Sequence, residues 1–161
     1  MKPIIFFSIK RCSRKIGRQA LIRNSVQSAI SCGKPALLSA SKPVGVSVVL
    51  TDDEQLHELN LAFRGYDKPT DVLSFVADGF EGANMPEQYL GDVIISMDHC
   101  KANAARADHG EDDELALLVV HGILHLLGFD HMNASDKSRM WAEQKRALKA
   151  INLSPKLRLP R

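Results

Sequence analysis

The alternation of apolar and polar positions along the chain predicts four strands. Short runs rich in β-branched and apolar residues are bounded by turn-forming residues, which is typical of β-strands. The predicted strands are residues 4–9, 46–51, 72–76 and 91–96. Residues 31–44, rich in glycine, serine and proline, and residues 78–88, with two glycines and a proline, are predicted to be loops.

Five segments instead repeat apolar residues at helical spacing. In the first of them this spacing places Ile16, Ala20, Ile22, Val26 and Ile30 on one face. The predicted helices are residues 13–31, 54–63, 97–107, 112–127 and 135–151, and a polar cap at residues 51–53 precedes the second. The predicted strands lie in the first two thirds of the chain, and most of the predicted helices follow them. This order favours an α/β fold, specifically an α+β sandwich in which helices cover a small mixed sheet. The order of the strands cannot be deduced from this pattern.

Length and composition restrict the class of protein. The 161 residues fit one compact domain, 1–161, and no apolar run reaches the length that spans a bilayer. A membrane protein is therefore disfavoured. The three cysteines, Cys12, Cys32 and Cys100, are too few and too widely spaced for a disulfide framework or a thiolate zinc site. They favour a reducing, intracellular setting, and we expect a cytoplasmic protein.

The net charge of +2 conceals a segregation of charge along the chain. Residues 1–50 contain nine basic and no acidic residues, and residues 137–161 contain eight basic residues and one acid, whereas residues 51–136 contain four basic residues and eighteen acids. Basic ends of this kind can neutralise phosphates of a nucleic acid. Solvated helix faces explain the same pattern equally well.

The acid-free N-terminus has a second interpretation. A segment rich in arginine and serine also describes an organellar transit peptide, which would place the protein in an organelle. We favour a folded N-terminus because residues 4–31 show the strand and helix patterns above. Lys10 and Arg11 interrupt the apolar run and disfavour a secretory signal.

Half of the six histidines fall within the segment HGILHLLGFDH, residues 121–131. His121 and His125 are four residues apart, so both imidazoles lie on one face of the predicted helix. Gly128 can adopt a left-handed conformation that ends the helix and brings His131 towards the same point. Three neutral imidazoles with an open fourth position form a recognised catalytic zinc arrangement. We predict one zinc ion bound by His121, His125 and His131.

The remaining residues of this region have less specific interpretations. Asp130 could set the tautomer of a ligand imidazole or cap the turn, and we favour the former. Gly122 stands where zinc peptidases carry the glutamate of HExxH, so a peptidase would lack its general base. The other histidines are interpreted as surface or hydrogen-bonded core residues, and the leucines as core packing around the ligand helix: His57, His99, His109, Leu124, Leu126 and Leu127.

The histidine segment resembles the HGxLHLxGxDH signature of the YbeY-type endoribonucleases, bacterial rRNA maturation factors. The resemblance continues upstream through Leu59 and Asn60, residues 63–66, DKPTDVLSF at 67–75 and LGDVIIS at 90–96. It spans most of residues 46–131, and the two ends match only in general layout. It implies an α/β sandwich and a zinc-dependent endoribonuclease specific for single-stranded RNA. Such an enzyme acts in 16S rRNA maturation and ribosome quality control, with ribosomal RNA and ribosomal subunit proteins as partners.

The resemblance also implies a function for Arg64. Independently, a guanidinium near a metal can clamp a phosphodiester and stabilise developing charge. We therefore predict Arg64 and His121 as catalytic residues, although a solvated charge at a helix end explains Arg64 as well. Thr70 and Asp71 could orient Arg64 or cap the turn. Attack by water and attack by the ribose 2′-hydroxyl both remain open.

Two rival functions follow from the same residues. One is a metal-dependent hydrolase of peptides or small molecules, which the absence of a glutamate at residue 122 disfavours. The other is an RNA-binding ribosome assembly factor with structural zinc. That rival requires a fourth protein ligand, for which His109 and Asp98 are the candidates.

Overall fold

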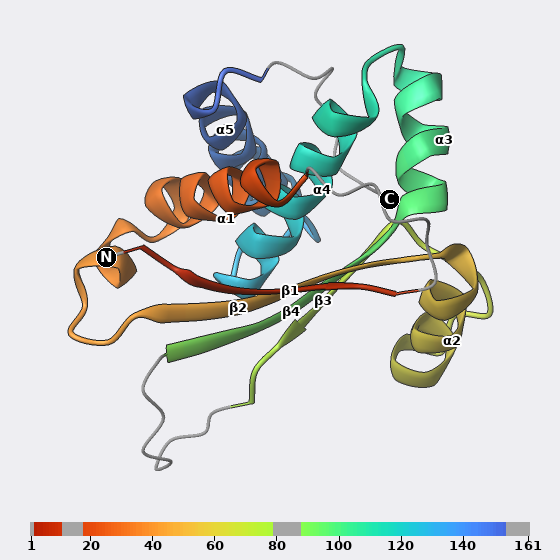
Figure 1. Cartoon of the computed structure of the whole chain (residues 1–161), viewed down its shortest axis with the longest axis horizontal. Coiled ribbons are helices and arrows are strands. Elements are labelled where there is room, and N and C mark those ends of the chain that lie inside the picture. Colours follow the sequence, from red (N-terminus) through yellow and green to blue (C-terminus); the bar gives the residue numbers. More distant parts are fainter. Residues whose placement is uncertain (1, 11–17, 79–87, 154–161) are drawn as a thin grey trace.

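The computed structural model describes residues 2–10, 18–78 and 88–153 (Figure 1). The elements in chain order are β1 (Ile4–Ile9), α1 (Gln19–Gly33), the 3-10 helix η1 (Pro35–Ser39), β2 (Val44–Thr51), α2 (Asp53–Arg64), β3 (Val72–Val76), β4 (Gln88–Ser96), α3 (Met97–Ala107), α4 (Glu111–Leu126) and α5 (Ala134–Ala150). This arrangement confirms the predicted α+β fold with a small sheet covered by helices.

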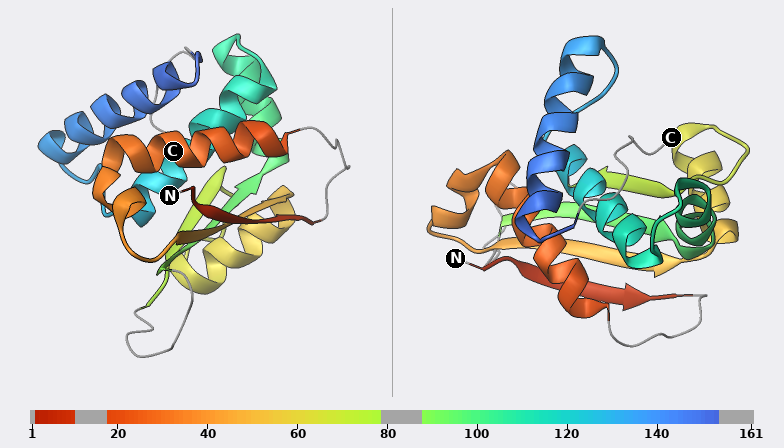
Figure 2. Two further views of the ribbon diagram at one scale, coloured as in Figure 1. Left: turned by 60° about the vertical axis from the view of Figure 1, so that its left-hand side comes forward. Right: turned by 90° about the horizontal axis from the view of Figure 1, so that it is seen from above.

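The four strands form one mixed sheet in the order β1-β2-β4-β3. β1 and β4 both run parallel to β2, whereas β3 pairs antiparallel with β4. β4 buries alternate side chains, among them Val93 and Ile95, whereas β2 is buried along nearly its whole length, Val46 and Val48 included. Since alternate residues share one face of a strand, these side chains form the sheet's contribution to the core. Helices α1, α4 and α5 lie over this face (Figure 2).

Helix α4 is the centre of the core. It packs against α1, α3, α5, β3 and β4. All side chains from Leu115 to Val120 are 0% exposed, so this part of the helix is apolar on every face. A helix of that kind is held from all sides. The metal-binding segment predicted from the sequence therefore begins on the most enclosed element of the described structure.

Helix α2 packs near the ends of β3 and β4, away from the main helical layer (Figure 1). Asp52 caps it by accepting a hydrogen bond from the Gln55 backbone N–H at 3.0 Å. Gly65, with φ of 73°, ends it immediately after Arg64. Phe63 contacts Phe75 on β3 edge to face, with ring centroids 5.2 Å apart. These contacts fix where Arg64 leaves the helix.

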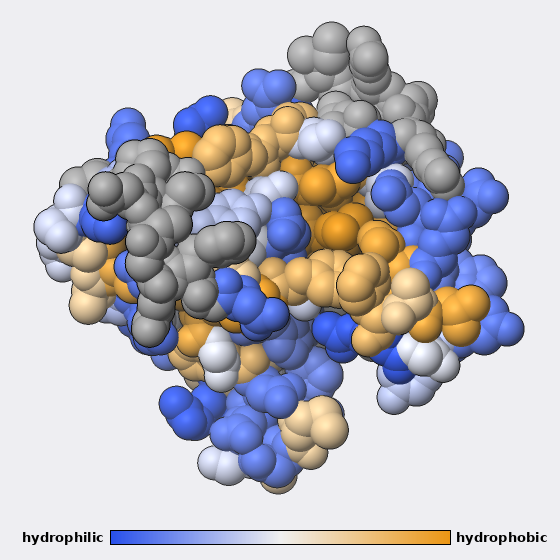
Figure 3. All heavy atoms as spheres, turned by 90° about the horizontal axis from the view of Figure 1, so that it is seen from below, coloured by the Kyte–Doolittle hydropathy of each residue, from blue (hydrophilic) through white to orange (hydrophobic). Residues whose placement is uncertain are grey.

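The face of the molecule seen from below is of mixed character (Figure 3). Hydrophobic side chains gather there among hydrophilic ones. The exposed large apolar residues on β1, α2 and β3 are Ile4, Phe6, Leu61, Phe63 and Val76. Among the described residues no helix combines the length and apolar character needed to cross a bilayer.

The predicted boundaries agree with the structure to within two residues, apart from the starts of β4 and α1 and the loop predicted at 31–44. Strands 4–9 and 72–76 and helix 97–107 have the predicted bounds. β4 begins at Gln88 instead of residue 91, because Gln88 pairs with Val44 of β2. α1 begins at Gln19, and the part of the predicted helix at residues 13–17, with Ile16, lies outside the described residues. The loop predicted at 31–44 contains the end of α1 and the helix η1, which has Pro35 in its first turn. Of the loop predicted at 78–88, residues 79–87 also lie outside the described part.

Candidate metal centre

The three histidines of the predicted metal site meet at one end of α4. His121 and His125 lie one turn apart on the helix, and Gly128, with φ of 92°, turns the chain back so that His131 joins them. One ring nitrogen from each histidine lies within 4.8 Å of the others. His121 is 2% exposed, and the other two imidazoles are partly exposed. The group therefore opens to solvent on the side of His125 and His131.

Oxygen acceptors hold the rear nitrogens of two of these rings. His121 Nδ1 lies 3.2 Å from Gln144 Oε1, and His125 Nδ1 lies 3.0 Å from the Phe129 carbonyl oxygen. Because both acceptors are oxygens, each Nδ1 carries the hydrogen and each Nε2 keeps its lone pair. Orientation of this kind is what metal-ligating histidines require.

The spacing of the free nitrogens fits a zinc ion. His121 Nε2 and His125 Nε2 are 3.1 Å apart. Two nitrogens bound to a tetrahedral zinc at ordinary bond lengths lie about 3.3 Å apart. The donor set and its spacing therefore match the predicted ligands, although their role as ligands stays a prediction.

The surroundings of His121 and His125 favour the neutral form of these two imidazoles. Burial lowers the pKa of His121 well below its ordinary value, and the neighbouring His125 lowers it further. Burial also lowers the pKa of His125, as does His131. Only a neutral imidazole has a lone pair to offer a metal. The site therefore holds His121 and His125 in the ligating form at neutral pH.

Arg64 shares a cleft with the three histidines. The cleft has a volume of about 720 Å³, and its walls come from the end of α2, the turn that leads into β3, helix α3 and the histidine segment. The positive charge of Arg64 lowers the pKa of His125, so the two side chains are within electrostatic reach. The structure thus brings together all four predicted site residues, which the sequence separates by up to 67 positions.

The charge of the cleft is opposite to that of the segment that forms it. Residues 51–136 contain only four basic side chains against eighteen acids. Three of the four basic residues, Arg64, Lys68 and Arg106, line the cleft, whereas Asp71 is the one carboxylate among its described lining residues. The cleft therefore favours an anionic ligand.

The remaining histidines are hydrogen-bonded to carboxylates, in agreement with their interpretation as non-ligands. His57 lies 2.6 Å from Asp67, and His109 lies 2.6 Å from the buried Glu114. His99 contacts Asp53 and also lines the cleft. Asp98 accepts a hydrogen bond from the Asp53 backbone N–H. Within the described ranges, the metal-binding group comprises the three histidines alone, without Asp98 or His109 as a fourth ligand.

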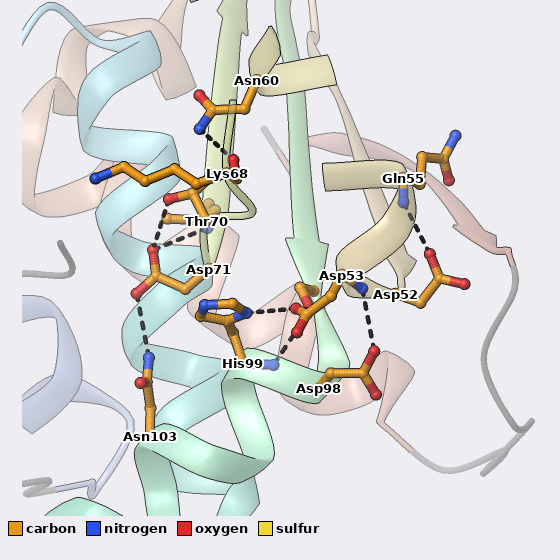
Figure 4. A network of polar contacts seen from close by, with 12 residues as sticks. Asp52, Asp53, Gln55, Asn60, Lys68, Thr70, Asp71, Asp98, His99 and Asn103 are labelled. Atoms are coloured by element: carbon orange, nitrogen blue, oxygen red, sulfur yellow. Dashed lines mark hydrogen bonds and ion pairs between the residues drawn. The ribbon is translucent and has the colours of Figure 1, made fainter. Parts of the chain in front are cut away.

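Two acidic residues act as turn caps. Asp130 Oδ1 accepts a hydrogen bond from the His131 backbone N–H at 2.7 Å, so the structure shows the capping alternative and not the hydrogen bond to an imidazole that we favoured. Asp71 Oδ1 accepts from the Val72 backbone N–H at 3.0 Å, and its other oxygen binds Asn103 and not Arg64 (Figure 4). Both carboxylates shape the backbone around the cleft.

The sequence interpretation missed Gln144 and the Phe129 carbonyl. Gln144 on α5 is 1% exposed and lies one turn from both Met140 and Leu148, which are buried. The sequence signal that could have identified Gln144 is that it is a polar residue on the apolar face of its helix, where a buried side chain needs a hydrogen-bond partner. The Phe129 carbonyl gave no side-chain signal at all. Ser74 was also missed; its hydroxyl donates to the Gly122 carbonyl at 3.0 Å and ties the ligand helix to β3.

Comparison with known proteins gives concordant matches. The family model described as "Endoribonuclease YbeY" matches residues 8–152. Proteins of that name include one from Roseiflexus castenholzii, 47% identical over 70% of this chain and 73% of the relative, and one from Symbiobacterium thermophilum, 40% identical over 84% and 88%. The solution structure of a Thermotoga maritima protein is similar in fold, with a TM-score of 0.55 and 23% identity over 92% of each chain.

Proposed function

The chain belongs to the YbeY endoribonuclease family, and from this premise we propose that it is a zinc-dependent enzyme that cuts single-stranded RNA during ribosomal RNA maturation. One observation carries the proposal. Three imidazoles converge beside Arg64 in a cleft that is lined by basic residues although the surrounding segment is acidic. A metal site next to a phosphate-binding guanidinium suits phosphodiester cleavage.

The histidines hold the metal in this proposal. His121, His125 and His131 would bind one zinc ion through ring nitrogens, two of which are fixed by Gln144 and the Phe129 carbonyl. When bound there, zinc supplies Lewis acidity towards a phosphodiester oxygen and towards water. Burial keeps His121 in its neutral form, and imidazole ligands carry no negative charge that would offset the charge of the ion.

Arg64 binds the scissile phosphate. Its guanidinium offers paired N–H donors, which match two oxygens of a phosphodiester. The Gly65 turn and the Phe63–Phe75 contact fix the backbone on either side of it, so the side chain starts from a defined position. Bound in this way, the phosphate is oriented and its developing negative charge is stabilised.

The cleft also supports a preference for single strands. Tyr66 lines it next to Arg64 and is 59% exposed, so its ring face is accessible. Unpaired bases stack on aromatic side chains, whereas paired bases in a duplex are already stacked on one another. Stacking on Tyr66 would therefore select unpaired nucleotides next to the scissile bond.

The wider role follows from the family and from the charge of the chain ends. We propose 16S ribosomal RNA as the substrate, ribosomal subunit proteins as partners and the cytoplasm as the location. The basic segments at residues 1–50 and 137–161 support this proposal, since they are suited to bind the phosphates of a large RNA without sequence preference.

A cleavage assay tests the proposal directly. Purified protein is incubated with a single-stranded and a duplex RNA, with chelator and after zinc is added back. We expect the single strand to be cut only with metal, and cutting to be lost in His121→Ala and Arg64→Ala but kept in His57→Ala, whose ring lies outside the cleft lining. A cyclic phosphate on the product indicates attack by the 2′-hydroxyl, and its absence indicates water.

Two results would contradict the proposal. Stoichiometric zinc without cutting of any RNA would favour the assembly factor with structural zinc. Cutting that is equal with and without chelator would separate the activity from the histidine cluster.

A further inference from the structure

Arg106 lies in the cleft and is held in a defined orientation. It comes from α3, whereas Arg64 and Lys68 come from the end of α2 and the turn after it. Its Nη2 donates to Asn103 Oδ1 at 2.6 Å, and its Nε donates to the Ala102 carbonyl at 3.4 Å. The residue as a whole is exposed. An exposed arginine that is oriented in this way loses less entropy when it binds an anion.

Two buried residues set the orientation of Arg106. Asn103 Nδ2 donates to Asp71 Oδ2 at 3.1 Å, and both residues are 3% exposed (Figure 4). Since the amide nitrogen faces a carboxylate, the amide oxygen must face Arg106. Asp71 cannot turn away, because its other oxygen accepts from the Val72 backbone N–H. The hydrogen-bonded chain Asp71–Asn103–Arg106 thus reaches from the interior to the wall of the cleft.

The position of this chain differs from that of the metal centre. Asp71 precedes β3, and Ser74, three residues further along, donates to the carbonyl of Gly122 next to His121. Three residues of extended chain cover about 10 Å. That distance exceeds the size of one phosphate group. Asp71, the inner end of the chain, is therefore set back along β3 from the ligand helix by more than the size of one phosphate group.

We propose that Arg106, oriented by Asn103 and Asp71, binds a second phosphate of the RNA strand, on a nucleotide next to or near the scissile one. This assignment rests on the proposed function and adds a second binding subsite to it. The proposal explains why a carboxylate is buried beside the cleft. Asp71 holds the Asn103 amide, and this amide in turn orients Arg106. The proposal also explains why Arg106 places an exposed positive charge in a segment that contains only four basic residues: the charge binds a phosphate.

The salt dependence of RNA binding tests the charge of the subsite. Affinity of a fluorescent ten-nucleotide single strand is measured by anisotropy at several salt concentrations, with chelator present and the strand checked on a gel. Arg106→Ala should weaken binding by roughly tenfold at low salt. It should also reduce the slope of log Kd against log salt by about 0.7, the value for one phosphate contact on a single strand. Lys101→Ala is the matched control, because Lys101 is exposed on the same helix and outside the cleft lining.

Two further variants separate orientation from structure. Arg106→Lys should keep the slope and lose part of the affinity, since it preserves charge but not the planar fork. Asn103→Ala should weaken binding in the wild-type background and add little in the Arg106→Ala background. A purely structural role of Asn103 would instead lower affinity equally in both.

Substrate length provides an independent readout. The increase in KM caused by Arg106→Ala should be larger for the ten-nucleotide strand than for a dinucleotide with one phosphate. An Arg106→Ala variant that matches Lys101→Ala in slope and KM would overturn the subsite, provided the wild type binds and cuts RNA. A wild type that neither binds nor cuts RNA would instead overturn the proposed function.

Discussion

Gly122 on α4 lies directly against Val93 on β4. A Cβ atom at Gly122 would be 2.5 Å from Val93 Cγ1 and 3.2 Å from Ser74 Oγ, both closer than ordinary contact. No larger residue fits between the ligand helix and the sheet without a shift of one of them. The glutamate of a zinc peptidase would have to occupy this position. Packing therefore disfavours a peptidase of the HExxH type, as does the identity of the residue.

Substitution Gly122→Ala should push α4 away from β4. Overpacking of this kind destabilises a core by about 1–3 kcal/mol. It should also move His121 and His125 relative to His131 and so weaken zinc binding. Thermal unfolding and zinc competition with a chromogenic chelator measure the two effects.

The double variant Val93→Ala/Gly122→Ala is the control for this interpretation. It removes the two methyl groups that the new Cβ would meet, so part of the lost stability and zinc affinity should return. If the double variant were worse than the sum of the single changes, the Gly122–Val93 contact would not be the cause.

Gln144 should contribute to zinc affinity although it is not a predicted ligand. Gln144→Leu keeps the volume but removes the oxygen that faces His121 Nδ1. The imidazole then loses the partner that sets its tautomer, and zinc affinity should fall by about 10- to 100-fold. Chelator competition measures the loss. Lys145→Ala, an exposed change on the same helix, should leave the affinity unaltered.

His131 should be required for zinc, whereas His57 should not. His131→Ala leaves two nitrogens for an ion that takes three protein ligands in catalytic sites. Metal analysis of the purified variant should show less than the single zinc per chain expected of the wild type. His57→Ala should retain zinc, because His57 contacts Asp67 and is outside the histidine group. Equal zinc contents in the two variants would contradict the ligand set.

Cys100 should be inert to thiol reagents in the native protein. It is 0% exposed, and burial together with the nearby Glu114 raises its pKa to about 12. A raised pKa keeps the thiol protonated, and the reactive form is the thiolate. Peptide mapping after iodoacetamide at pH 8 should find Cys32, which is partly exposed, modified before Cys100. Denatured protein should lose this difference; modification of native Cys100 at the same rate as Cys32 would contradict it.

Local patterns predicted much of the fold. The strand at 72–76 and the helix at 97–107 were predicted with correct bounds, because local signals define them: the strand is a largely apolar run, and Ser96 caps the helix directly before its first residue. The start of β4 at Gln88 depends on its pairing with Val44, over forty positions away. Pairings of that range also set the strand order, which no local pattern records.

The same distinction applies to the metal centre. The three histidines and Gly128 lie within eleven residues. Helical spacing of His121 and His125 and a turn at Gly128 were therefore sufficient to predict that the histidines converge. Gln144 reaches His121 from another helix, and Asn103 reaches Asp71 across 32 positions. In the sequence, Gln144 and Asn103 look like any other polar residue of a helix, because only tertiary packing defines their contacts.

The burial of α4 has a consequence for the exchange of metal. His121 is 2% exposed and is carried by the helix that packs against α1, α3, α5, β3 and β4, so freeing it requires opening the core, which is among the rarest fluctuations of a folded protein. His131 lies instead on the partly exposed turn after Gly128, beside Met132, which is 82% exposed. We therefore expect ion entry and departure to follow brief detachment of the turn. Residence time should respond to substitutions in residues 128–132 much more than to changes in global stability.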